Sequence, residues 1–237
     1  MNYRRMFLIG LIGLSIMALL SINWTVAEAQ DGEGIFKSKG CGDCHAVDGP
    51  SKLKNIEDRV KQKGPDLWFA GSKFKPRFLK TWLEKPSDLT GIKYSELLSV
   101  KGKNSHPALS KKEASDVADY LMTLKDKEMA TGIIDDKKKM KRGDMFKAGT
   151  LFQKTQVCFG CHLFKPKKRT KRAIGGFSGP SLVGAKKRLT GDWVYSYLKD
   201  QKRYVPVGRM PIYQGPEFQA YSDKDLKALA QYIVNLY

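Results

Sequence analysis

The feature that most constrains the fold is a repeated pentapeptide, CGDCH at residues 41–45 and CFGCH at residues 158–162. The two copies contain every cysteine of the chain: Cys41, Cys44, Cys158 and Cys161. They also contain two of the three histidines, so that only His106 lies outside them. A chain that concentrates its rarest reactive side chains in two matching patterns is built around two copies of one chemical site.

The pattern C-x-x-C-H is typical of covalent attachment of c-type haem. Its two thiols can add to the two vinyl groups of one porphyrin, and the histidine that follows can bind the iron. We therefore predict two covalently bound haem c groups, with His45 and His162 as iron ligands and the four cysteines as the attachment points.

Other uses of paired cysteines fit less well. A zinc ribbon separates its CxxC pairs by about 15 to 20 residues, whereas more than a hundred residues separate the pairs here. A thioredoxin-like CxxC follows a strand in a βαβ unit, and neither copy has that setting. Four cysteines are an even number, so disulfides stay possible by count, but a bridge within CxxC closes a loop too small to stabilise the chain much.

The first 29 residues have the order of an export signal. Arg4 and Arg5 come first, an uncharged apolar run follows over residues 6–22, and Ala27-Glu28-Ala29 has the small-x-small pattern of a cleavage site. The run is longer than the about 7 to 15 residues of a signal core and shorter than the roughly 20 of a spanning helix. Residues 1–29 are thus expected to be a signal peptide, which we favour, or an N-terminal membrane anchor. Either places the rest in the periplasm or on the extracytoplasmic face of the membrane.

An internal repeat extends well beyond the pentapeptides. Residues 64–83 and 179–198 have the same length and both begin with Gly-Pro-x-Leu. Residues 110–120 and 222–232 both begin with a serine that an acidic residue follows three positions later, which is a capping-box pattern in the first case and a weaker relative in the second. Apolar residues then recur at helical spacing.

The repeat predicts an all-α fold with two tandem domains and no strands. The expected divisions are a first domain at 30–125, a charged linker at 126–143 and a second domain at 144–237. Each domain is expected to have a short helix before its pentapeptide, a middle helix, a ligand loop and a terminal helix.

These features resemble the class I cytochrome c family, in tandem. The family has a CxxCH, a later Gly-Pro-x-Leu, a Met-Pro and a closing helix with an aromatic residue near its end, which correspond here to Gly64-Pro65-Asp66-Leu67, Gly179-Pro180-Ser181-Leu182, Met210-Pro211, Tyr120 and Tyr232. The resemblance implies that the carbonyl of Pro65 orients the ring of His45, and that Pro180 does the same for His162. Such a contact fixes the tautomer of a ligating histidine and raises its basicity.

The two copies differ at the position of the second iron ligand. The resemblance implies that Met210 binds the second iron through its sulfur; the alternative is a core methionine in a loop. The first copy has His106-Pro107 instead. His106 precedes a proline as Met210 does, lies four residues before Ser110, and is the only histidine outside the pentapeptides. We therefore predict that His106 binds iron, because imidazole suits iron. The alternatives are an open iron, Met122 or a nearby lysine.

The ligand difference predicts a direction for electrons. Methionine raises the reduction potential of a haem, whereas a second imidazole lacks this effect. A low-potential haem is therefore expected in the first domain and a higher-potential haem in the second, with electrons passing from the former to the latter.

The charge of the chain suggests the kind of partner. The formal net charge is +19, and +18 without residues 1–29, where Arg4, Arg5 and Glu28 sum to +1. A basic surface steers acidic partners toward it. The strongest cluster is KPKKRTKR at 165–172, expected to be either a solvated loop or a docking patch for an acidic redox protein or an anionic membrane. Nucleic acid is not expected, because the chain is exported and has no recognition motif.

The leading hypothesis is a non-enzymatic electron carrier, free in the periplasm or attached to a respiratory complex. The alternative is a diheme peroxidase-like enzyme, or a haem subunit of an oxidoreductase, with one open iron. A haem-based sensor or structural subunit is a third hypothesis, although nothing resembles an output domain. The following aromatic residues are expected to pack around haem: Phe36, Trp68, Phe69, Phe78, Trp82, Tyr120, Phe152, Trp193, Tyr197 and Tyr232.

Overall fold

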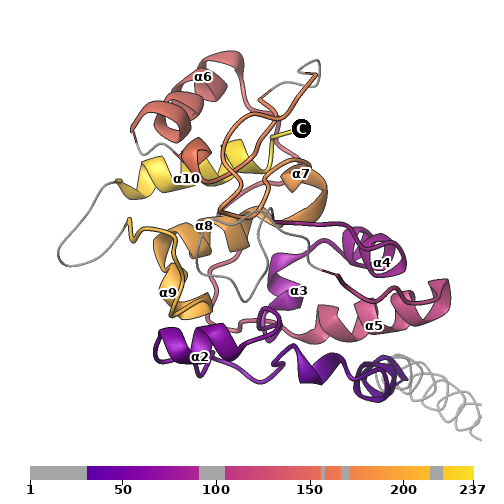
Figure 1. Cartoon of the computed structure of the whole chain (residues 1–237). Coiled ribbons are helices and arrows are strands. Elements are labelled where there is room, and N and C mark those ends of the chain that lie inside the picture. The colour runs from indigo at the N-terminus through magenta and orange to yellow at the C-terminus, as the bar shows by residue number, and fades with distance from the viewer. Residues whose placement is uncertain (1–30, 91–104, 156–157, 167–170, 214–220) are drawn as a thin grey trace, which may run out of the picture.

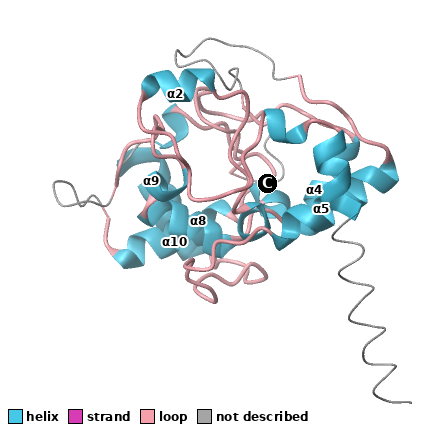
Figure 2. Cartoon of the chain, turned by 90° about the horizontal axis from the view of Figure 1, so that it is seen from below, coloured by secondary structure: helices cyan, strands magenta, loops and turns pink. Residues whose placement is uncertain are grey.

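The computed structural model describes residues 31–90, 105–155, 158–166, 171–213 and 221–237. Within these ranges the chain forms helices and isolated β-bridges but no strand, which confirms the predicted all-α fold (Figure 2). The first domain contains a helix over 31–38, the 3-10 turn η1 (Cys41–Asp43), α2 (Ile56–Lys61), α3 (Ala70–Lys73), α4 (Pro76–Glu84) and α5 (Lys111–Thr123). The second contains α6 (Arg142–Thr150), the π-turn η2 (Leu151–Thr155), the 3-10 turn η3 (Cys158–Gly160), α7 (Ala185–Arg188), α8 (Gly191–Lys199), α9 (Gln201–Tyr204) and α10 (Asp223–Ile233).

The helices repeat as the sequence does. α4 and α8 have nine residues each, and α3 and α7 have four each. Both pairs are related by the same shift of 115 positions, from 76 to 191 and from 70 to 185. The terminal helices α5 and α10 both begin with a complete capping box. Asp225 forms both hydrogen bonds of the box, as Glu113 does, although its sequence pattern is the weaker one.

In each domain the helix before the pentapeptide crosses the terminal helix at an aromatic pair. Phe36 packs on Tyr120 and Phe152 packs on Tyr232, with ring centroids 5.6 Å apart in both cases. Phe36 lies five residues before Cys41, whereas Phe152 lies six residues before Cys158. The π-turn η2 accommodates the additional residue, because a π-turn holds one residue more than an α-turn.

The crossing in the first domain depends on a glycine. A Cβ atom at Gly32 would lie 2.1 Å from the carbonyl oxygen of Asp116 on α5, while a Cβ atom at Gly34 would meet nothing within 4 Å. We expect Gly32→Ala to lower the free energy of unfolding by about 1–3 kcal/mol, because the helix backbones must move apart. Gly34→Ala, in the same helix, should raise it by about 0.5–1 kcal/mol. Urea unfolding of both variants checks this, and equal effects would contradict the crossing.

The two domains contact each other through equivalent segments. Phe74 at the end of α3 forms an antiparallel bridge with Leu189 at the end of α7, which is the residue 115 positions later. The backbone N–H of Lys75 donates to Arg188 O, and that of Thr190 donates to Lys73 O, both at 2.9 Å. Exchanging the domains exchanges these two bonds, so the contact has local two-fold symmetry. Figure 1 shows α3 and α4 of the first domain beside α7 and α8 of the second.

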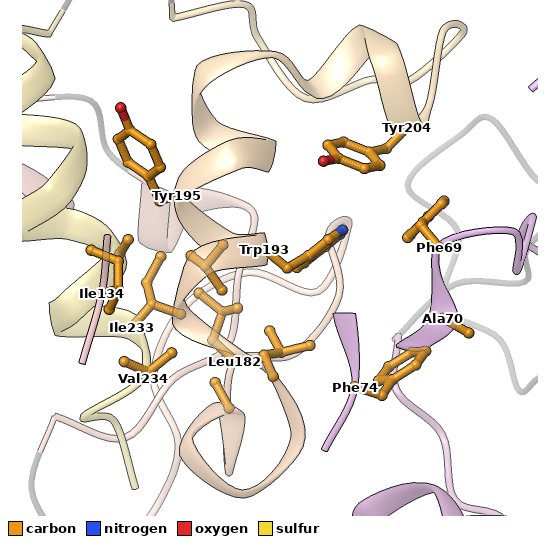
Figure 3. Close-up of a cluster of buried hydrophobic side chains, with 14 of the residues drawn as sticks. Phe69, Ala70, Phe74, Ile134, Leu182, Trp193, Tyr195, Tyr204, Ile233 and Val234 are labelled. Carbon is orange, nitrogen blue, oxygen red and sulfur yellow. The ribbon is translucent and has the colours of Figure 1, made fainter. Parts of the chain in front are cut away.

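Aromatic rings surround this two-fold contact. Phe69 stacks on Trp193 at 6.1 Å and 7°, and Trp68 stacks on Tyr204 at 5.9 Å and 14°. Figure 3 shows Phe69 and Phe74 of the first domain facing Trp193 and Tyr204 of the second. Trp68, Phe69 and Trp193, which were expected to pack around haem, thus pack across the domain interface.

The segment assigned as a charged linker is folded onto the second domain. Asp126 is buried and accepts two hydrogen bonds from the Arg203 guanidinium, at 2.6 and 2.8 Å, and one from the Tyr204 hydroxyl at 3.0 Å. Further along, the carboxylate of Asp192 accepts bonds from three consecutive backbone N–H groups, at residues 132–134. The connection therefore fixes the domains to each other.

Candidate haem-binding sites

Each pentapeptide forms a single tight turn. Cys41–Asp43 and Cys158–Gly160 are 3-10 turns, and the backbone N–H of each following histidine donates to the first cysteine, at 3.1 Å for His45 and 3.0 Å for His162. All four cysteines lie in the described part of the chain and none forms a disulfide. In each pair the first cysteine is half-buried and the second is exposed. Burial raises the pKa of the Cys158 thiol to about 11 and also raises that of Cys41.

Both histidines that follow the cysteines are held by a proline carbonyl. His45 Nδ1 lies 2.7 Å from Pro65 O, and His162 Nδ1 lies 2.6 Å from Pro180 O. These are the contacts that the family resemblance implies. A carbonyl oxygen only accepts, so Nδ1 carries the proton in each ring and Nε2 keeps a lone pair. The Gly-Pro pairs thereby leave Nε2 as the nitrogen for a metal.

The glycine of each Gly-Pro pair makes this contact possible. A Cβ atom would lie 2.6 Å from His45 Cε1 at Gly64 and 2.7 Å from His162 Cε1 at Gly179. Burial lowers the pKa of both histidines, and the proline carbonyls oppose this only partly. The neutral ring, which is the form that binds metals, is favoured at both positions.

The structure brings His106 beside His45. Their ring centroids are 6.1 Å apart with an angle of 41° between the rings. His106 Nδ1 lies 2.8 Å from Pro107 O, so this ring also keeps Nε2 as its free nitrogen. Metal–imidazole bonds are about 2 Å long, which puts the centres of two rings on one ion roughly 6 Å apart. The spacing therefore fits one iron between the two rings.

The loop that carries His106 is held from two sides. The indole of Trp82 on α4 lies 4.7 Å from the His106 ring, and its N–H donates to Ser87 O at 2.9 Å. The backbone N–H of Leu109 donates to Leu83 O at 3.0 Å. The terminal turn of α4 thus positions the ring of His106 beside that of His45.

Met210 is placed by neighbours on both sides of it. The Gln201 side-chain amide donates to Met210 O at 3.0 Å and also to Pro211 O. The guanidinium of Arg209 donates to Ser178 O at 2.7 Å, two residues before Pro180. The Tyr213 hydroxyl lies close enough to the Cys158 thiol to lower its pKa, in opposition to burial. The methionine loop is therefore tied both to the second pentapeptide and to the loop that holds His162.

Buried polar groups at the domain interface fit the carboxylates of haem. Arg188 is only 6% exposed and its guanidinium donates to Ser181 O, with no ion pair to it among the described residues. The indole N–H groups of Trp68 and Trp193 are buried and have no partner among the described residues. Lys73 lies against the Trp193 ring at 4.6 Å. Buried cations and donors require an anion, and the haem propionates would supply it.

Sequence reasoning missed Lys73 and Arg188, although a signal was present. Each is a cation eight residues after the proline of a Gly-Pro pair. Their roles are apparent only from the structure, which buries Arg188 and places both at the interface. The basic cluster at 165–172 lies partly outside the described residues, and residues 1–29 lie wholly outside them.

The fold and the two sites define a tandem haem-binding protein of the all-α class. A model of the cytochrome c family matches residues 29–125 and 147–237, which is more than half of the chain. The chain belongs to the cytochrome c family and carries two covalently bound haem c groups, as predicted. No curated protein and no solved structure matched the chain. None of the helices in the described part of the chain is long and apolar enough to cross a membrane.

Proposed function

We propose that this diheme cytochrome transfers single electrons between extracytoplasmic redox partners, through a bis-histidine haem of low potential in the first domain and a histidine–methionine haem of higher potential in the second. Haem iron supplies one-electron exchange, and the protein sets its potential through the ligands and their surroundings. The observation that carries the proposal is the pairing of His45 and His106 at 6.1 Å, each with Nε2 free.

A pair of imidazoles on one iron supports electron transfer over catalysis at the first site. An enzyme that activates a small molecule needs an open iron position, and His106 would fill it. The Trp82 ring and the backbone bond at Leu109 hold His106 in place. Substrate binding would require this loop to move.

The domain interface supports transfer between the two sites within one chain. The residues that fit the haem carboxylates come from both domains and meet there, because Lys73 and Arg188 flank the two-fold contact. Electrons would enter at the first domain and leave from the second, following the rise in potential from two imidazoles to imidazole plus thioether.

The partners of this function are an acidic redox protein or a membrane respiratory complex. The net charge of +19 favours partners of opposite charge. Cytochrome c domains are typically extracytoplasmic. Residues 1–29 would provide export or membrane attachment.

Electron paramagnetic resonance at low temperature tests the proposal on the fully oxidised protein. We expect two low-spin signals, one of bis-histidine and one of histidine–methionine type, and a redox titration with two separate steps. The bis-histidine haem should be the one that oxidises first. A full-intensity high-spin signal from one haem would indicate an open iron and favour an enzymatic function instead. Equal or reversed potentials would contradict electron transfer from the first domain to the second.

A further inference from the structure

Acidic residues are distributed very unevenly between the two copies. In the first copy five of them lie between Phe36 and Lys75: Asp43, Asp48, Glu57, Asp58 and Asp66. The matching segment of the second copy, Phe152 to Thr190, contains none, and the acid-free stretch extends over residues 145–191. The second domain (144–237) has 17 basic and 6 acidic residues, a net +11, while the first (30–125) has 18 and 13, a net +5. The surroundings of the second pentapeptide are therefore much more positive.

Exposed aliphatic side chains gather near the second pentapeptide. Ile174, Val183 and Ile212 are 44%, 36% and 44% exposed. Ile174 pairs through its backbone with Phe164, and Leu182, which precedes Val183, donates to Leu163 O beside His162. Ile212 precedes Tyr213, whose hydroxyl lies beside the Cys158 thiol. These contacts place all three close to the pentapeptide.

The first copy combines its exposed aliphatic side chains with acidic residues: Ile56 and Val60 on α2 are 57% and 47% exposed, and Glu57 and Asp58 lie between them. The counterpart of Val183, 115 positions earlier, is Trp68, which is buried in the domain interface. The pentapeptide itself also differs, since the first copy has the exposed Asp43 where the second has Gly160.

The cations near the second pentapeptide are exposed and unneutralised. Lys171, Arg172 and Lys187 are exposed, and no ion pair in the described part of the chain involves them. In the first domain Lys37 pairs with Glu33 and Lys39 pairs with Glu113, and the exposed Lys52 and Lys54, which have no ion pair among the described residues, lie in the segment that contains the five acidic residues. An apolar centre with a charged rim is the usual composition of a docking surface, and charge of one sign steers partners of the other.

We propose that Ile174, Val183, Ile212, Lys171, Arg172 and Lys187 form the docking surface for an acidic redox protein, and that the face around the first pentapeptide is not one. The inference rests on the proposed function and names its partner. It makes electron exit from the second domain dependent on salt, and electron entry at the first domain much less so.

Relaxation mapping tests the location of this surface on the fully reduced, haem-loaded protein. The probe is hexacyanochromate(III), a paramagnetic trianion that does not exchange electrons with haem. We expect it to broaden the amide signals of residues 171–174, 183, 187 and 212, and to leave residues 41–48 sharp. This result does not depend on electron transfer, so it distinguishes a failure of the docking surface from a failure of the proposed function. Equal broadening at both pentapeptides would overturn the inference.

A charge-reversal pair tests the partner. Lys171→Glu/Arg172→Glu should slow oxidation by an acidic blue-copper protein about ten-fold at low salt, and the difference should shrink as salt is added. Lys52→Glu/Lys54→Glu makes the same change in net charge at exposed positions of the first domain and should leave the rate within roughly two-fold. Equal slowing by both pairs would assign the effect to net charge and overturn the surface. If vesicles of phosphatidylglycerol protect the same amides and the blue-copper protein does not, the face binds a membrane instead.

Discussion

Replacing His106 by methionine should raise the reduction potential of the first haem on the order of 0.2 V, a fraction of the roughly 0.8 V that axial ligands can span. The reason is that a thioether favours reduced iron more than a second imidazole does. The 6.1 Å spacing of the His45 and His106 rings places the new sulfur where the imidazole was. A spectroelectrochemical titration measures the shift, and the bis-histidine resonance signal should disappear with it.

The second domain offers a matched control for this change. Met210→His should lower the potential of the second haem, so that the two variants move their steps in opposite directions. Combining them should invert the order of the two potentials. If His106→Met leaves both the titration and the resonance signals unchanged, His106 is not an iron ligand.

Replacing Asp126 by alanine should lower the free energy of unfolding by about 2–3 kcal/mol. Removing one partner of a buried ion pair costs about 3–5 kcal/mol, and the effect is smaller here because the Arg203 side chain is 30% exposed while that of Asp126 is 1% exposed. The variant leaves Arg203 and Tyr204 without their shared acceptor. Urea unfolding of the haem-loaded protein measures the loss.

Glu128 provides the control, because it also pairs with Arg203, at 2.8 Å, but its side chain is 78% exposed. Glu128→Ala should cost less than about 1 kcal/mol, as exposed pairs do. The bond from Arg203 lowers the pKa of Asp126, so its contribution is present at neutral pH and is lost as the pH falls below the ordinary range of a carboxyl group. Equal costs for the two variants would show that Asp126 does not lock the domains.

The repeated part of the fold could be predicted from the sequence, because it depends on local patterns. Ser110 and Ser222 mark the starts of α5 and α10, since a capping box involves only four consecutive residues. The contacts of Pro65 with His45 and of Pro180 with His162 followed from a motif in which each residue has a fixed place. The position of His106 beside His45 was expected from its spacing to a proline and a serine.

The domain interface was not predictable in the same way. The bridge between Phe74 and Leu189 joins residues 115 positions apart, and no local period marks such a pair. Trp68 and Trp193 have the aromatic character that haem packing also requires, so composition could not separate the two roles. Asp126 belongs to a charged segment in which only the fold shows that one carboxylate is buried.

The two-fold contact at Phe74 and Leu189 has a consequence for the origin of the chain. A surface that pairs with its own copy about a two-fold axis is the surface of a homodimer. The tandem chain has the geometry of a single-haem homodimer whose subunits became one polypeptide. Covalent connection makes such pairing independent of concentration. It also allows the two halves to differ in sequence. One half could then keep a histidine and the other a methionine, and under the proposed function a symmetric pair would become a directional one.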